Sequence, residues 1–415
     1  MTPDLPESAD VVIVGGGPAG LSAAIELRAG GVASVLVVDR ESEAGGIPRH
    51  CNHYPYGLRE FHRLMRGPEY ARQLVQKAAT AGVRIFTGTT VTALLPGPQL
   101  QLSNASGLHS ISAKRVLLAT GVRETSRAAR LIGGVKPGGV ISTGALQGLV
   151  YLDGLKPFQR PVILGTELVS FSAIMTCRHL GIRPIAMIEA GRRITARRPA
   201  ALYPAFLGIP VYRNTTLLSI EGHSQVSAVH LCTDGGPARR LETDGVIVSG
   251  QFRPDASLLR VSHIDVDSAT GGPSVDQYGR CSDPDYFAAG NLLRPVETAG
   301  WCWNEGRQIG RAIAQSLAGK LPDHSPVLSF SVGSDKIKFV LPQRLARQTS
   351  TPALPDFQLR LKESARGQIT AVSDNTIVAE TAINTVPERR ITHPLSLIPS
   401  GLTGMLEFNL REKSE

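Results

Sequence analysis

Short apolar runs recur along the first 250 positions, and each ends at a glycine or an acid. Val11–Val14 runs into Gly15–Gly20, residues 21–29 have helical spacing up to Gly30, and Val35–Val38 ends at Asp39. This order predicts a strand, a glycine turn, a helix and a second strand, which is a βαβ unit. The pattern then predicts a helix over 69–81, a strand over 83–86, an antiparallel meander within 90–113 and a buried strand over 116–119.

The same order returns after residue 160. The pattern predicts a strand over 161–164 that meets Gly165, a helix over 167–180, a strand over 185–188 that ends at Glu189, a meander within 215–241 and a strand over 246–248. A repeat of this length predicts two domains of similar fold. Residues 323–415 instead alternate apolar residues with Ser, Thr and Pro, which favours β-structure.

The expected fold class is therefore α/β, with two Rossmann-like dinucleotide-binding domains and a small β-rich C-terminal domain. The first domain is expected to be discontinuous, at residues 1–122 and 272–322, because a second glycine-rich segment follows the repeat. The second domain is expected at 123–271 and the C-terminal domain at 323–415.

The first glycine turn has the spacing GxGxxG at Gly15, Gly17 and Gly20. The first glycine permits the tight turn, the second lets a pyrophosphate approach the backbone, and the third lets helix and strand pack closely. The helix N-terminus would offer free N–H groups to phosphates. Asp39, about twenty residues farther on, is placed to accept hydrogen bonds from a ribose.

Charge and cysteine content exclude several classes of protein. The net charge is +9, but the basic residues are scattered apart from a short group at Arg192, Arg193, Arg197 and Arg198, so nucleic-acid binding is not expected. The five cysteines are dispersed without CxxC spacing, so we expect no metal site, no iron–sulfur cluster and reduced thiols in the cytoplasm. Residues 1–10 do not resemble a signal peptide, and no apolar run approaches the roughly 18 residues of a membrane span.

These motifs resemble the FAD domain of the glutathione reductase and thioredoxin reductase superfamily. The resemblance rests on residues 11–20 (VVIVGGGPAG), Asp39, Gly45–Gly46, Ala119–Gly121 (ATG) and Tyr286–Asn291 (YFAAGN). The last motif usually ends in Gly-Asp, whereas this chain has Asn291, whose amide can still bond a ribityl hydroxyl. The resemblance implies FAD bound by Gly15, Gly17, Pro18, Ala19, Gly20, Asp39, Arg40, Gly46, Arg49, Ala119, Thr120, Gly121, Gly290, Asn291, Ala299 and Gly300.

A closer resemblance covers about residues 8–320. Residues 45–51 (GGIPRHC), 57–61 (GLREF), 167–173 (ELVSFSA) and 297–306 (ETAGWCWNEG) are similar to the FAD-containing subunits of multi-subunit dehydrogenases that act on amines, imino acids and opines. That group includes octopine and nopaline oxidases, hydroxyproline dehydrogenases and dye-linked proline dehydrogenases. It implies partner subunits: a second flavin subunit together with a small iron–sulfur subunit, which relay electrons from an oxidised C–N bond.

The redox cysteine pair of disulfide reductases is missing from both places where the superfamily has it. The stretch after Gly46 holds only Cys51, and 139–147 (GVISTGALQ) has no cysteine. A redox disulfide needs two sulfurs within bonding reach, so thioredoxin-reductase activity is not expected. Cys51 is either a thiol whose pKa Arg49 and His50 lower, or a small residue in a cofactor-lining loop.

The second glycine turn departs from the motif, because Glu167 and Ser170 replace its second and third glycines. A carboxylate at the middle position would repel a pyrophosphate. Glu189 favours NAD over NADP, while the arginines that follow favour an anion. Three alternatives stay open: a working NAD(P) site, a structural adenine nucleotide, or a fold that has lost its ligand.

The residues expected near the flavin ring include several candidates for catalysis, but no pair of residues that is diagnostic of one reaction. A helix is expected over 298–316, with its positive N-terminus toward a flavin. Trp301 either stacks on the ring or is an ordinary packed aromatic. Further candidates for catalysis or for holding a substrate carboxylate are Arg49, His50, Cys51, His53, Arg59, His62 and Arg63. Two alternatives to a dehydrogenase subunit remain: a stand-alone NAD(P)H-dependent flavin reductase and a scaffold with structural FAD.

Overall fold

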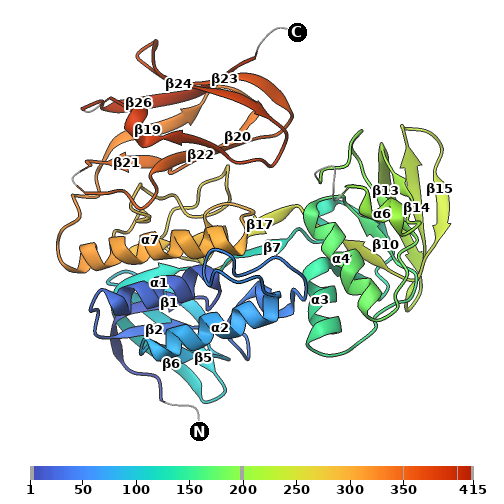
Figure 1. The fold of residues 1–415 in the computed structure, drawn as a ribbon, viewed down its shortest axis with the longest axis horizontal. Helices are drawn as coiled ribbons and strands as arrows, with labels where there is room; N and C mark the ends of the chain where they lie inside the picture. Colours follow the sequence, from blue (N-terminus) through green and yellow to red (C-terminus); the bar gives the residue numbers. More distant parts are fainter. Residues whose placement is uncertain (1–3, 197–200, 349, 400, 413–415) are drawn as a thin grey trace.

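The computed structural model describes residues 4–196, 201–348, 350–399 and 401–412. Figure 1 shows an α/β unit built from the blue N-terminal residues, a second α/β unit in green and yellow, and a β unit in orange and red. No helix in the described ranges is both long enough and apolar enough to cross a bilayer. The α/β class expected from the sequence is confirmed.

The first unit is a sheet whose central strands run parallel, in the order β3-β2-β1-β6, with β18 on the other side of β6. The first half of β6 instead pairs antiparallel with β5, so the expected meander and buried strand share one long strand. The bounds are β1 (Ser8–Val14), β2 (Val35–Val38), β3 (Arg84–Phe86), β4 (Thr90–Leu95), β5 (Gln99–Asn104), β6 (Gly107–Leu118) and β18 (Tyr286–Ala288).

Three helices pack on this sheet: α1 (Pro18–Ala29), α2 (Gly67–Thr80) and α7 (Ala299–Leu317). Figure 1 shows α7 between α1 and the C-terminal sheets. Helices α1 and α7 approach closely because α7 carries glycines on the shared face: a Cβ on Gly306 would lie 2.1 Å from the Ala19 carbonyl oxygen. Glu26 of α1 then pairs with Arg307 and Arg311 of α7.

The second unit has the parallel order β12-β11-β10-β16-β9, beside an antiparallel meander. The sequence assigned no element to residues 133–151, where the structure has β8, β9 and α3; strands of two or three residues leave almost no periodicity to read. The bounds are β8 (Gly133–Gly134), β9 (Val140–Ser142), α3 (Thr143–Tyr151), β10 (Val162–Leu164), α4 (Leu168–His179), β11 (Ala186–Ile188), α6 (Tyr203–Phe206), β12 (Val211–Tyr212), β13 (Thr215–Gly222), β14 (Val226–Thr233), β15 (Arg239–Glu242) and β16 (Val246–Val248).

A two-stranded ribbon of β7 (Val122–Glu124) and β17 (Phe252–Pro254) connects the two units. Directly after β17, Ala256, Leu259 and Ile264 are buried in the hydrophobic core of the first unit. We therefore propose that the chain returns to the first domain at β17, earlier than the boundary after residue 271 that the sequence suggested.

The C-terminal residues form two sheets that enclose one core, as the alternating pattern indicated. Phe330, Phe357 and Phe408 meet edge to face in this core, with ring centroids 4.7–6.0 Å apart. The strands are β19 (Pro326–Val332), β20 (Ile337–Leu341), β21 (Arg344–Ala346), β22 (Asp356–Leu361), β23 (Ala365–Ser373), β24 (Thr376–Thr385), β25 (Ile391–Pro394) and β26 (Gly404–Glu412).

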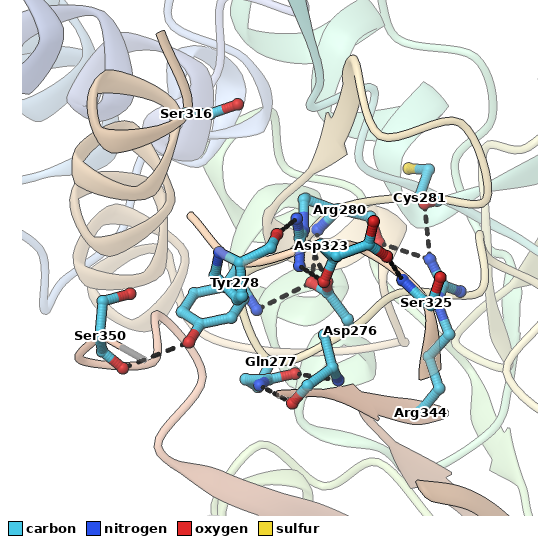
Figure 2. Close-up of polar contacts among 12 residues, drawn as sticks. Asp276, Gln277, Tyr278, Arg280, Cys281, Ser316, Asp323, Ser325, Arg344 and Ser350 are labelled. Atoms are coloured by element: carbon cyan, nitrogen blue, oxygen red, sulfur yellow. Dashed lines mark hydrogen bonds and ion pairs between the residues drawn. The ribbon is translucent and has the colours of Figure 1, made fainter. Parts of the chain in front are cut away.

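A polar junction joins this C-terminal domain to the first unit (Figure 2). Arg280 pairs with Asp276 at 2.7 Å, and both side chains are almost fully buried. Gln277 exchanges two hydrogen bonds with the backbone of Ala346. Arg344 donates to the carbonyl oxygens of Arg280 and Cys281. The Arg280–Asp276 pair stays within the first unit, whereas the hydrogen bonds of Gln277 and Arg344 cross to the other side and hold the C-terminal domain in place.

Candidate functional site

In the first glycine turn, the protein backbone packs tightly against Gly15 and Gly20 but leaves space beside Gly17. A Cβ on Gly15, whose φ is +111°, would lie 2.4 Å from the Ala119 carbonyl oxygen, and one on Gly20 would lie 2.0 Å from the Gly15 carbonyl oxygen. Both positions therefore require glycine for close packing. A Cβ on Gly17 would instead meet only the Cα of Gly46, at 3.9 Å. The backbone at Gly17 is thus open to a ligand.

The open side of the turn faces the N-terminus of α1, which begins at Pro18. Proline suits this position because it lacks the N–H that would have no helical partner there. Among the described residues, the N–H groups of Gly17, Ala19 and Gly20 have no protein acceptor. Free N–H groups and the positive end of the helix dipole together make a cradle for phosphate.

Asp39 lies at the end of β2 and is 9% exposed. One carboxylate oxygen accepts the N–H of Gly16 at 2.7 Å, and the other accepts the N–H of Glu41 at 2.9 Å. Burial raises the pKa of Asp39. Asp39 therefore holds the glycine turn in place by accepting the N–H of Gly16. The spacing of the sequence did not indicate this role, which is additional to the proposed contact with a ribose.

The segment after β2 covers the turn. Gly46 has a φ of +64°, and a Cβ there would lie 2.8 Å from the Cα of Gly17. Arg49 is largely buried and pairs with Glu41 at 3.5 Å and Glu43 at 3.7 Å. Its positive charge is therefore directed to acids of its own loop.

The Ala-Thr-Gly segment closes the opposite side of the crevice. The Ala119 N–H donates to the Val14 carbonyl at 2.8 Å, and the Thr120 hydroxyl donates to the Asp255 carbonyl at 2.9 Å. The Asp255 carboxylate also pairs with the exposed Arg40 at 3.1 Å. Gly121 has a φ of +77° and open space around it. The segment therefore borders the crevice without filling it.

Gly290 and Asn291 are held by groups of the protein itself. The Gly290 N–H donates to Glu305 at 2.7 Å. The side-chain oxygen of Asn291 accepts the N–H of Glu297 at 2.6 Å, and its NH₂ group donates to the Glu297 carbonyl at 3.1 Å. A ribityl hydroxyl would thus share Asn291 with the loop that leads into α7.

A buried ion pair that the sequence did not reveal supports this motif. Arg294, which is 2% exposed, donates to both carboxylate oxygens of Glu305, at 3.0 and 2.6 Å. It also donates to the Gly290 carbonyl and to Gln358 of the C-terminal domain. Through Arg294, the C-terminal domain is therefore linked to the segment 286–291 that carries Gly290 and Asn291. Arg294 precedes α7 and Glu305 lies within it, so the two side chains share no helix whose periodicity could have predicted the pair.

The N-terminus of α7 carries free donors and a pinned aromatic ring. In the described part of the chain, the N–H groups of Ala299 and Gly300 have no protein acceptor. Trp301 has two guanidinium groups close to its ring, those of Arg59 at 5.0 Å and Arg390 at 3.4 Å from the ring centre. Its stacking on a flavin stays a prediction.

Cys51 is a buried thiol, and the hypothesis that Arg49 and His50 lower its pKa is wrong. Burial raises the pKa of Cys51 to about 11, and its sulfur donates to Gln147 of α3 at 3.4 Å. Burial and the charge of Arg49 lower the pKa of His50, which is therefore neutral near pH 7. Neutral His50 cannot stabilise a thiolate, and Arg49 is directed toward acids.

We expect Cys51→Ser to keep its flavin and its reduction by dithionite, because the thiol is neither ionised nor exposed. In the unaltered chain, iodoacetamide should leave Cys51 largely unmodified at pH 8 under native conditions, as peptide mass spectrometry would measure. Cys232, which is partly exposed, serves as the internal positive control. Rapid alkylation of Cys51, or loss of flavin reduction in Cys51→Ser, would restore a redox role for this thiol.

The second glycine turn keeps the backbone of the first, but a side chain fills its crevice. Gly165 has the same φ of +111° as Gly15. The Glu167 carboxylate accepts the N–H of Gln251 at 2.9 Å, and a Cβ on Gly250 would lie 2.2 Å from it. Because Gly250 follows β16 and Glu167 follows β10, the carboxylate bridges the ends of two neighbouring strands. A dinucleotide crosses such a sheet at this crevice.

The Glu189 carboxylate is also hydrogen-bonded within the protein. It accepts the N–H of Gly191 at 2.8 Å and the hydroxyl of Thr166. Thr195 and Ala196 in turn donate their N–H groups to Thr166, so residues 195–196 lie over the second turn. Arg192 and Arg193 are exposed, while Arg197 and Arg198 lie outside the described residues. Both acids of the second site thus have partners within the protein.

The remaining candidates do not converge on one group. The His53 ring contacts the Tyr54 carbonyl, Arg63 pairs with Glu69 at 3.1 Å, and His62 is exposed. Within the described ranges, no three His, Cys, Asp or Glu side chains lie close enough together to hold a metal ion.

Comparison with known proteins places the chain among flavoproteins. Residues 9–315 match the pyridine nucleotide-disulphide oxidoreductase family. One subunit of the opine oxidase of Rhizobium meliloti (strain 1021) is 28% identical over 245 residues, which are 53% of this chain and 52% of that protein. The alpha subunit of the sarcosine oxidase of Corynebacterium sp. (strain U-96) is 26% identical over 266 residues, 60% of this chain and 27% of that protein.

A solved structure supports the fold alone. Thioredoxin reductase of T. acidophilum superposes with a TM-score of 0.61 at 22% identity and covers 75% of this chain and 99% of its own. The chain spans about half the length of the opine oxidase subunit that it matches. Activity, substrate and partners of these whole proteins therefore do not pass to this chain directly.

Proposed function

Because the chain belongs to the pyridine nucleotide-disulphide oxidoreductase family, we propose that it is the FAD-binding subunit of a multi-subunit dehydrogenase. Such an enzyme would oxidise a C–N bond of an amino, imino or opine-type substrate and pass the electrons to a partner subunit. Members of the family bind FAD and use NAD(P)H, and the chain is an FAD-dependent oxidoreductase. Several of its relatives are named as subunits or components of multi-component enzymes.

The contrast between the two glycine turns carries this proposal. Gly17 and Glu167 occupy equivalent positions before a helix and have similar backbone angles, with φ/ψ of −83°/−174° and −69°/166°. At the first turn the space over the backbone is open, whereas at the second a carboxylate occupies it. The first crevice therefore suits a dinucleotide, and the second does not. A flavin here would receive its electrons from a source other than a nicotinamide in the second domain.

The residues of the first crevice fit FAD. The N–H groups at the start of α1 would bind the diphosphate, and Asp39 would accept a ribose hydroxyl. The N–H groups of Ala299 and Gly300 would stabilise negative charge at the pyrimidine edge. FAD, when bound, supplies a reversible acceptor for the electrons of an oxidised C–N bond. The five cysteines, all within the described residues, are free thiols and form no disulfide that could accept electrons from the flavin.

An anaerobic titration tests this proposal against its competitors. We expect NADH and NADPH to leave the visible absorption of the purified holo-chain unchanged, while dithionite bleaches it. In a complex isolated from the native cell, a C–N substrate should bleach the flavin. Rapid bleaching by NADH would establish the stand-alone flavin reductase, which the use of NAD(P)H in the family favours. A flavin that no substrate reduces in the complex would establish the structural scaffold.

Removing the Glu167 carboxylate should open the second crevice. We expect Glu167→Gly to bind NADH weakly, as quenching or enhancement of NADH fluorescence would measure, because the space beside Gly250 and Gln251 is freed. Glu167→Gln, which keeps the side-chain volume, is the matched control and should stay without binding. Equal NADH affinity of all three proteins would show that Glu167 does not block the site.

A further inference from the structure

The strand β24 forms one edge of the larger C-terminal sheet, whose strand order is β21-β19-β26-β23-β24. It is ten residues long and, among the described residues, pairs with β23 alone. Figure 1 labels β24 at the top of the C-terminal domain, on the side away from α1 and α2. Within the described chain, the N–H and C=O groups along its outer side therefore have no partner strand, and such a row can pair with a further strand.

The other outer strands of the domain carry features that discourage such pairing, which are short length, Lys side chains or Pro. The opposite edge of the same sheet, β21, has three residues. In the facing sheet, the edge strand β20 contains Lys338 and the edge strand β25 ends at Pro394. The sequence of β24 is TIVAETAINT, in which Glu380 is the one charged residue. This long edge of the domain is therefore suited to pairing.

The burial of β24 determines which of its side chains face the core. Ala379 and Ile383 pack against the hydrophobic core of the domain. Glu380 and Ala382 alternate with them and are exposed. A strand that extends the sheet at this edge must keep its apolar side chains on the core side, so every second register is excluded.

Strand length and charge then select one arrangement of β24 with itself. In an antiparallel pair about a two-fold axis, the longest overlap places either Glu380 or Thr381 on the axis. With Glu380 on the axis, two carboxylates would face each other, which is destabilising. With Thr381 on the axis, Glu380 faces Ala382 of the second copy. Ile383 then faces Ala379 of the second copy on the core side, so each copy covers an apolar edge of the other.

We propose that β24 pairs in this register with β24 of a second copy of this chain, so that two five-stranded sheets become one continuous sheet. The strand is complementary to itself in charge, apolar contact and hydrogen bonding, which favours a second copy over an unrelated strand. The pairing uses residues of the C-terminal domain only. This dimer goes beyond the proposed dehydrogenase function and does not depend on it.

Sedimentation equilibrium of the FAD-loaded chain over a concentration series tests this dimer. We expect a reversible monomer–dimer equilibrium, with slower amide hydrogen exchange across residues 376–385 in the dimer. Ala382→Glu should raise the dimer dissociation constant roughly tenfold, because the symmetric interface then sets a carboxylate against Glu380 twice. Ala382→Lys is the matched control at the same exposed position, and it should keep the dimer because its ammonium group faces Glu380 of the second copy.

The reversed charge pair tests the register itself. Ala382→Glu combined with Glu380→Lys should restore the dimer, since opposite charges again face each other. A chain that stays monomeric at every concentration would overturn the proposal, as would a dimer that Ala382→Glu leaves unchanged or that Ala382→Glu and Ala382→Lys weaken equally. A double variant as weak as Ala382→Glu would exclude this register. Protection of residues 376–385 only in a complex with a different protein would also overturn the proposal and assign the edge to that partner.

Discussion

Gly17→Glu is expected to yield a folded chain that no longer retains FAD. The backbone at Gly17 is extended, with a negative φ that any residue adopts, and open space lies over it. The second turn of the same protein already carries glutamate in this conformation. The substitution therefore leaves the fold intact and places a carboxylate where the diphosphate would bind.

The expected loss of affinity is large. Two like charges about 4 Å apart repel each other by about 4 kcal/mol at the effective dielectric constant of a protein surface, which corresponds to roughly a thousandfold increase in the FAD dissociation constant. Fluorescence titration of apoprotein with FAD measures this change. Gly148→Ala, in open space on α3, is the control and should bind FAD normally. A Gly17→Glu chain that keeps its yellow colour would exclude a diphosphate at this turn.

Arg294→Met is expected to destabilise the protein by about 3–5 kcal/mol, because it leaves the Glu305 carboxylate buried without its partner. Urea unfolding would measure the loss of free energy. Arg294 also bonds the Gly290 carbonyl and Gln358, so FAD retention should weaken in the folded fraction.

Two further variants separate the ion pair from general effects of removing arginine. Arg240→Met breaks only pairs between exposed side chains, with Glu221 and Glu242, and should cost less than about 1 kcal/mol. Arg294→Met combined with Glu305→Leu removes both charges and should recover part of the stability. If Arg294→Met were no more destabilising than Arg240→Met, the buried pair would have no structural role.

The first crevice was the most predictable part of the molecule, because its features are local in sequence. The strand over 35–38, the glycine turn and the helix that Gly30 ends all follow from a few adjacent residues. Loss of the motif at Glu167 was visible for the same reason. The sequence could not show that the Glu167 carboxylate turns toward Gln251, which lies 84 residues farther along the chain.

Features that depend on distant contacts escaped prediction. Arg294 donates to Gln358, which lies 64 residues farther along the chain. The Trp301 ring contacts Arg59 and Arg390, which belong to different parts of the chain. The choice between the two alternatives for Cys51 has a similar cause: neighbouring cations could suggest a low pKa, whereas burial by distant parts of the chain raises it. The spacing of residues predicts which helix, strand or turn a segment can form. Burial, which depends on the whole fold, determines which titratable groups are charged.

Quantifying flavin in the purified, folded chain tests the central claim most directly. The account predicts one FAD per chain, released on denaturation and absent from Gly17→Glu. A colourless chain that unfolds cooperatively yet takes up no added FAD would contradict it.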